Sequence, residues 1–303
     1  MRIQVISDLH MEFMDSVPGI GNAGADVLIL GGDICVAEHL YRNPLSIIGI
    51  DGTVTDLTRV LNKDWHGWDA KRFREFFKRC SEGWANVIYV MGNHEHYNGR
   101  WERTEGVLRD ELSRHPNIHL LEQNKLVIDD MVFLGASLWT DLNNHDPITM
   151  NAMRDMMNDY RSVSDFTHGD FRRLSPDTTV RKHDETVAWL RLMLAEDKRT
   201  TVVVTHHCPS QQSVHPKYAG QTIMNGAFSS NLDHIMMDHD HIKLWTFGHT
   251  HSGHRYRIND TLCVCNPHGY PNESGTGFDP NLVIDLDNMP IQDMFNKTLW
   301  VDQ

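Results

Sequence analysis

Two pairs of metal-ligand residue types stand out in the sequence because the members of each pair are two positions apart. Asp8 and His10 form the first pair, and His249 and His251 form the second. In extended backbone, residues two apart project to the same face, so both members of a pair could bind one cation. A carboxylate oxygen with an imidazole nitrogen suits Mn, Fe, Zn, Co or Ni better than Ca or a metal that prefers thiolates.

Further candidate ligands raise the total above the coordination number of a single ion. The full set is Asp8, His10, Asp33, Asn93, either His206 or His207, His249 and His251. A set of this size predicts two metal ions, divalent or trivalent. Asp33 follows two glycines, which allow close approach of the backbone. We therefore expect its carboxylate to bridge the ions, as in two-metal phosphoryl-transfer sites.

His94 follows Asn93 directly and is the candidate general acid. An imidazole with a pKa near neutrality could protonate a leaving alkoxide or stabilise the transition state. Two divalent ions would bring four positive charges, of which two carboxylates remove two, so the site would attract an anionic phosphate. His207, His96 and His268 are weaker candidates for contacts with the substrate.

The rest of the chain must position these residues. Five apolar runs, at 3–7, 27–30, 87–91, 202–205 and 244–247, each lead into them. Short apolar runs bounded by turn residues are typical of buried strands, and ligands bind beyond the carboxyl ends of strands in open α/β sheets. A single Asp-x-His or His-x-His is ordinarily a polar turn after a strand. The prediction therefore depends on the ordered combination.

Other elements are predicted from periodicity. Helical spacing marks 68–84 and 103–115, and further strands are expected at 118–121, 126–128, 131–137 and 282–286 and near Leu262. Residues 11–25 are expected to form an exposed connection, and 34–64 have no clear period. From about 146 to 195 we expect a helical cap or insertion within one domain that spans 1–303. Its arginines, Arg154, Arg161, Arg172 and Arg173, could bind phosphate oxygens, although a solvated helix face is the more frequent role.

Composition limits the partners of the protein. The formal net charge of −13 disfavours duplex nucleic acid, because such binding requires many Lys or Arg contacts with phosphates. Cys35, Cys80 and Cys208 are widely scattered, and Cys263 and Cys265 alternate as in a strand, so the five cysteines do not form a disulfide pattern and we expect a reducing compartment. The sequence shows no secretory leader and no apolar run of membrane-spanning length, so we expect a cytoplasmic protein without a membrane partner. Nothing in the sequence indicates the oligomeric state.

The ordered set Asp8-Leu9-His10, Gly32-Asp33, Gly92-Asn93-His94-Glu95, His206 and Gly248-His249-Thr250-His251 resembles the calcineurin-like metallophosphoesterase superfamily. This resemblance implies an α/β fold of two packed β-sheets flanked by helices, with His94 as the catalytic histidine. It further implies one metal bound by Asp8, His10, Asp33 and His251, and a second bound by Asp33, Asn93, His206 and His249. His206 is preferred over His207 because it directly follows the apolar run.

Departures from the superfamily patterns narrow the expected activity. Asp33 is followed by Ile34-Cys35-Val36, and not by the Asp-Arg-Gly of protein Ser/Thr phosphatases. His94 stands where the lipid A pathway pyrophosphatases have arginine. The expected function is hydrolysis of a small phosphodiester or phosphomonoester by attack of a metal-bridging hydroxide.

Two alternatives stay open at this point. One is a metal-dependent nuclease, for which Trp65, Trp68, Trp101 and Tyr97 are the aromatic candidates. The other is a catalytically silent binding module with the phosphoesterase fold. The complete ligand set and the presence of His94 favour an enzyme over this second alternative.

Overall fold

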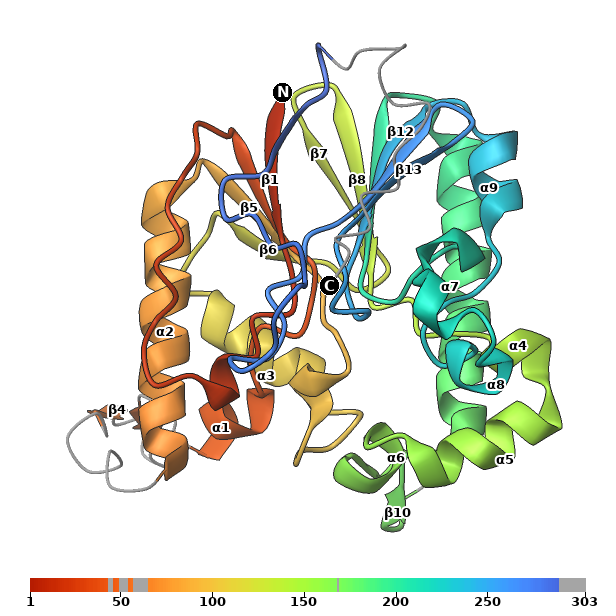
Figure 1. The fold of residues 1–303 in the computed structure, drawn as a ribbon. Helices are drawn as coiled ribbons and strands as arrows, with labels where there is room; N and C mark the ends of the chain where they lie inside the picture. The colour runs from red at the N-terminus through yellow and green to blue at the C-terminus, as the bar shows by residue number, and fades with distance from the viewer. Residues whose placement is uncertain (43–45, 49–53, 57–64, 168, 289–303) are drawn as a thin grey trace.

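Two β-sheets pack face to face at the centre of the protein, and helices cover their outer faces (Figure 1). The computed structural model describes residues 1–42, 46–48, 54–56, 65–167 and 169–288 of the 303-residue chain. The predicted α/β fold with two sheets flanked by helices is confirmed. No helix in these ranges is long and apolar enough to cross a membrane.

The first sheet has the strand order β15-β1-β2-β5-β6. Its parallel strands are β1 (Arg2–Ile6), β2 (Val27–Leu30), β5 (Asn86–Tyr89) and β6 (Ile118–Leu120), and β15 (Val283–Asp285) pairs antiparallel at the edge. The apolar run of β2 is buried along its whole length because both faces of the sheet are covered. Val27 and Ile29 contact the other sheet, whereas Leu28 and Leu30 pack under the helices.

The second sheet has the order β13-β14-β12-β11-β8-β7. Its parallel strands are β8 (Met131–Ala136), β11 (Thr201–Thr205), β12 (Ile242–Phe247) and β14 (Thr261–Cys265). The antiparallel strands β7 (Asn124–Ile128) and β13 (His254–Ile258) form its edges. All five apolar runs that lead into candidate ligands are therefore parallel strands of the two sheets.

Helices cover the outer face of each sheet. In Figure 1, α2 (Trp65–Gly83) lies to the left with α1 (Ala37–Arg42) and α3 (Thr104–Leu112), and their apolar side chains share one core cluster with the first sheet. On the right, α7 (Pro176–Glu196) and α9 (Asp233–Asp238) pack on the second sheet. Ser175 caps α7 by accepting a hydrogen bond from the backbone N–H of Thr178, and Pro176 occupies the first turn.

A smaller helical layer lies near the lower end of the sheets in Figure 1. It contains α4 (Leu142–His145), α5 (Pro147–Met156), α6 (Asp159–Ser162) and α8 (Thr222–Asn225), with the short pair β9 (Ser164–Asp165) and β10 (Arg172–Arg173). Met153, Tyr160 and Trp139 belong to its apolar cluster. The range predicted as a helical insertion thus holds α5, α6 and the β9–β10 pair. Leu190 and Leu194 of α7, however, pack in the cluster of the second sheet.

Some elements were not predicted from the sequence. Helix α1 and the pair β3 (Ser46–Ile48) and β4 (Val54–Asp56) fall in the range without clear periodicity, and β13 was not expected. Within the connection expected at 11–25, Met11 and Glu12 are buried in a short 3₁₀ turn, Met11–Phe13. The single-domain prediction extends over residues 289–303, which lie outside the described ranges.

Candidate metal centre

The candidate ligands meet where the carboxyl ends of the parallel strands of both sheets come together. The backbone N–H of Asp8 donates to the carbonyl of Gly32 at 2.9 Å, which joins the ends of β1 and β2. The N–H of Gly248 donates to the carbonyl of His206 at 2.8 Å, which joins the ends of β11 and β12. Residues that are far apart in the sequence are therefore held side by side by backbone hydrogen bonds.

Strained backbone is concentrated at these positions. A positive φ is uncommon for residues with a Cβ and costs on the order of 1–2 kcal/mol each. Left-handed conformations, with φ between 46° and 70°, occur at five of the candidate ligands: Asp8, His10, Asp33, His249 and His251. The surrounding hydrogen bonds hold the loops in these conformations, as is typical of functional sites.

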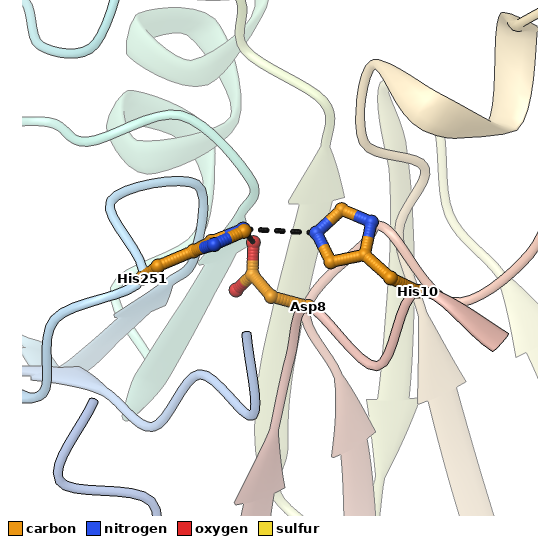
Figure 2. Close-up of side chains that lie close together, drawn as sticks. All are labelled: Asp8, His10 and His251. Carbon is orange, nitrogen blue, oxygen red and sulfur yellow. Dashed lines mark hydrogen bonds and ion pairs between the residues drawn. The ribbon is translucent and has the colours of Figure 1, made fainter. Parts of the chain in front are cut away.

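The first donor group is formed by Asp8, His10 and His251. The Nε2 atoms of His10 and His251 are 2.8 Å apart, and Asp8 Oδ1 is 3.6 Å from His251 Nε2. Figure 2 shows the three side chains pointing toward one another, with Asp8 at the end of β1. Their donor atoms converge on one point, which is the arrangement required of a metal site.

The second donor group is formed by Asp33, His206 and His249, whose donor atoms lie within 4.8 Å of one another. His206 Nε2 is 3.4 Å from Asp33 Oδ2 and 3.1 Å from Asn93 Oδ1. The amide of Asn93 donates to Asp159 Oδ1 at 2.7 Å, so its oxygen is directed toward His206. Asn93 therefore presents its oxygen to this group as well.

Asp33 links the two groups. Its Oδ2 atom is 3.7 Å from His10 Nε2 in the first group and 3.4 Å from His206 Nε2 in the second. Burial alone would raise the pKa of Asp33, but the adjacent His206 and His94 outweigh it and hold this pKa well below its usual value. Asp33 is therefore an ionised carboxylate between the two donor groups.

Outer hydrogen bonds orient the imidazoles. His206 Nδ1 donates to the carbonyl of Gly31 at 2.8 Å, and His251 Nδ1 is 2.6 Å from Glu273 Oε2. A proton on Nδ1 leaves Nε2 as the electron-pair donor, which is the usual state of a metal-ligating histidine.

Two donor atoms in the site have no hydrogen-bond partner among the described residues. These atoms, His249 Nε2 and Asp8 Oδ2, are both buried. A buried polar atom without a partner is costly unless a ligand satisfies it. The donor chemistry and these two atoms fit first-row metal ions.

Glycine at position 92 allows the loop after β5 to approach Asp33. A Cβ at Gly92 would collide with Asp33 Oδ1 and would lie 2.7 Å from both the backbone nitrogen of Asp33 and His206 Cε1. The carboxylate of Glu95 then ties the loops together, because it accepts hydrogen bonds from the backbone N–H of Asp33 at 3.0 Å and of Gly92 at 2.7 Å. The phenol of Tyr89 donates to the same carboxylate at 2.6 Å.

His94 faces the donor groups from the start of a 3₁₀ turn, His94–His96. Its Nδ1 atom is 2.7 Å from Glu12 Oε1, and its Nε2 atom is 3.4 Å from the hydroxyl of Tyr270. Burial would lower the pKa of His94, but Asp33 and Glu12 outweigh it and raise this pKa to about 9. The contact with the Glu12 carboxylate places a proton on Nδ1 of the imidazole. Its donor atom also lies within 4.8 Å of those of His10 and Asp33.

The three predicted substrate contacts lie outside the adjacent cleft. His207 stacks on Trp139, with 4.9 Å between ring centroids, and His96 stacks on Trp101 at 4.6 Å. His268 Nδ1 is 2.8 Å from the carbonyl of Gly269, and this histidine lines a separate cavity together with Phe13. None of the three is among the residues that line the cleft beside His94.

That cleft has a volume of about 360 Å³ and opens directly on the donor groups. On one side it is lined by Asp33, Asn93, His94, His249 and His251. Tyr270 and Glu273, which sequence reasoning missed, also line it. Glu12 and Asp159 were missed as well, because each comes from a loop or short helix whose sequence gives no ligand pattern. One indication for Glu12 was present in the sequence, where it stands two residues after the candidate ligand His10.

Similarity to known proteins agrees with this geometry. The model of the calcineurin-like phosphoesterase family matches residues 1–253, so the chain belongs to that family. It is 25% identical over 309 residues to the uncharacterized protein L509 of Acanthamoeba polyphaga mimivirus, with 97% of this chain and 100% of the relative covered. Its fold is similar to the crystal structure of phosphopantetheinyl hydrolase from Mycobacterium tuberculosis, with a TM-score of 0.56, 16% identity and 89% of each chain covered. The chain is thus a phosphoesterase-family protein with candidate His and Asp metal-binding groups.

Proposed function

We propose that the protein is a dinuclear metal-dependent phosphoesterase that hydrolyses a small phosphodiester or phosphomonoester. The observation that carries this proposal is the position of Asp33, whose Oδ2 atom lies between His10 Nε2 at 3.7 Å and His206 Nε2 at 3.4 Å. A carboxylate shared by two donor groups is the arrangement of two-metal phosphoryl-transfer sites. Membership of the calcineurin-like phosphoesterase family supports the same reaction class.

The proposed ligands form two sets that share Asp33. Asp8, His10, Asp33 and His251 would hold one ion, and Asp33, Asn93, His206 and His249 would hold the other. His206 is proposed in preference to His207 because its Nε2 faces Asp33, whereas the ring of His207 packs on Trp139. When bound, Mn, Fe, Zn, Co or Ni ions would neutralise phosphate oxygens and lower the pKa of a water.

We assign the protonation of the leaving alkoxide to His94. Its Nε2 faces the cleft beside the Tyr270 hydroxyl, and its Nδ1 is held by Glu12 at 2.7 Å. A protonated imidazole within reach of the leaving oxygen can supply the proton as the ester bond breaks. Glu12 acts through His94 and is therefore a positioning residue.

The cleft supports the nuclease alternative less well. Of the four aromatic candidates, Tyr97 lines the cleft, whereas Trp68 is exposed on α2 and Trp101 is covered by His96. The side chain of Trp65 lies outside the described part. A nuclease would also bind its substrate in a basic groove, and no lysine or arginine lines the cleft within the described part of the chain. Location in the cytoplasm is also a proposal, supported by five cysteines that are buried free thiols.

The first test compares hydrolysis of bis-p-nitrophenyl phosphate and p-nitrophenyl phosphate by the Mn-loaded protein, with Asp33→Ala as the contamination control. Asp33-dependent cleavage of either ester supports the proposal, and the faster substrate identifies the diester or monoester preference. Metal binding without Asp33-dependent turnover of either ester would contradict it, and would favour a silent binding module or a pyrophosphate substrate.

A further inference from the structure

Beyond the candidate ligands, the wall of the cleft near α5 and α8 combines apolar and polar side chains. Its apolar side chains are Met156 at the end of α5, Met157, Met224 of α8, Phe228 and Tyr218, and its polar side chains include Asn158, Gln221 and Asn225. Methionine side chains are flexible and polarizable, so they adapt to apolar groups of different shape. The cleft therefore joins an anion-binding end at the donor groups to a region near α5 and α8 that offers three methionine side chains.

Positive side chains are missing from this wall. Among the described residues that line the cleft, none is a lysine or an arginine. The four arginines considered from the sequence have other partners: Arg154 pairs with Asp177, Arg161 bonds to Asn158, Arg172 pairs with Asp170, and Arg173 lies over the Phe171 ring at 5.4 Å. A second phosphate or carboxylate on a ligand would find no Arg or Lys to pair with here.

A negative side chain further disfavours a second anion. Glu273 lines the cleft, with its Oε2 atom 2.6 Å from His251 Nδ1. Its carboxylate would repel a charged substituent placed near the mouth. An uncharged substituent on the ligand would not be repelled by this carboxylate.

The apolar surface continues to the outside of the cleft. The side chains of Met156, Tyr218 and Tyr270 line the cleft and are nevertheless 52%, 44% and 40% exposed. A group longer than the cleft could therefore contact Met156 or the ring of Tyr218 outside it. Exposed apolar side chains grouped at a binding site commonly mark the path of an apolar ligand.

We infer that the site takes a phosphate ester whose leaving alcohol is uncharged and largely apolar, with this alcohol seated against Met156, Met157 and Met224. The inference rests on the proposed hydrolase function and adds the class of the substrate. In the reaction, water adds to phosphorus and the P–O bond to the alcohol breaks. The alcohol oxygen takes a proton from His94, and the proton lost by the water restores the acid.

Binding of non-hydrolysable alkylphosphonates tests this substrate class. Isothermal titration of the Mn-loaded protein would compare methyl-, hexyl- and decylphosphonate, with phosphonoacetate as the probe that carries a second anion. Partial burial of each added methylene is expected to tighten binding about twofold, hence about 30-fold from methyl- to hexylphosphonate. Phosphonoacetate should bind more weakly than hexylphosphonate.

Two matched variants locate the effect. Met156→Lys places a cation in this wall of the cleft, and Met237→Lys places the same residue on α9, where Met237 is 61% exposed and does not line the cleft. Met156→Lys should weaken hexylphosphonate binding about tenfold and strengthen phosphonoacetate binding. Met237→Lys should leave both affinities as in the wild type.

Several outcomes would overturn the inference. They are equal affinity for methyl- and hexylphosphonate, tighter binding of phosphonoacetate than hexylphosphonate by the wild type, or the same effect from both methionine variants. Failure of the proposed hydrolysis gives a different result. If the hydrolase function is wrong but the ligand class is right, the affinity for alkylphosphonates still rises with chain length. Neither nitrophenyl ester is then hydrolysed in an Asp33-dependent manner.

Discussion

Glu12 Oε1 lies 2.7 Å from His94 Nδ1, so a carboxylate from the loop after β1 fixes the imidazole that faces the cleft. Both groups are buried, and the two histidines in contact with Glu12 outweigh its burial and lower its pKa to about 2. The ionised carboxylate accepts a hydrogen bond from Nδ1–H, which leaves Nε2 directed at the cleft. The contact with Glu12 therefore fixes the orientation of the His94 ring.

Replacement of Glu12 by glutamine should reduce kcat about tenfold, with a smaller effect on KM, because outer partners of catalytic histidines commonly have this influence. The loss should be larger for esters with poor leaving groups, since these depend most on protonation. Glu12 also lies 3.4 Å from His10 Nδ1, so metal content must be measured alongside the kinetics. Equal losses for good and poor leaving groups, at unchanged metal content, would argue against this role.

His94→Ala and Asp33→Ala should have different effects on metal binding and on turnover. Without Asp33 the shared carboxylate is lost, and we expect loss of both metal binding and turnover. Without His94 the proposed ligands remain, so the metals should stay bound while kcat falls about 10²- to 10⁴-fold. Elemental analysis and steady-state kinetics on both variants provide the check. Loss of metal from His94→Ala would indicate that this residue is a ligand.

Gly92→Ala should damage the site through sterics alone. The added Cβ meets Asp33 Oδ1 and the backbone nitrogen of Asp33, which cannot move without breaking the loop. We expect a loss of about 2 kcal/mol in the free energy of unfolding and loss of metal binding. Gly106→Ala in α3 is the control, because nothing lies within 4 Å of its Cβ. Urea unfolding should show that this control is stabilised by up to about 1 kcal/mol.

Stability should fall in acid because of His254 on β13. Burial, with His215 nearby, lowers the pKa of His254 from 6.5 to about 4 in the folded protein. The unfolded chain therefore takes up this proton first, so stability is lost as the pH falls from about 7 to about 4, by about 3 kcal/mol at most. Urea unfolding across this range should give a shallower pH dependence for His254→Gln. Parallel curves for the two proteins would contradict the assignment.

Long apolar runs made the core of the fold predictable. The run at 27–30 coincides with β2, and the other four runs that lead into candidate ligands overlap strands of the two sheets. Helix α1 escaped prediction because its six residues are fewer than two turns, too short for a 3.6-residue period to appear. Strand β13 alternates buried and half-buried residues with two arginines, as an edge strand does, and its signal was weaker than that of the central strands.

The candidate site was predictable in part for a similar reason. Asp8, His10 and Asp33 lie within four residues of a strand end, so their convergence could be inferred from strand ends. Glu12, Asp159 and Tyr270 have no such position. They reach the site through the packing of loops and a short helix, and local sequence does not encode these distances.

The convergence of β1 and β12 has a consequence for synthesis of the protein. Each proposed metal set contains a residue from the turn after β12, His249 or His251, together with residues from the first third of the chain. A nascent chain therefore lacks a complete set until residue 249 has been translated, and lacks the other until residue 251. Contacts between residues so far apart in the sequence form slowly. We therefore expect the protein to bind its metal ions after release from the ribosome, when its two sheets have already packed together.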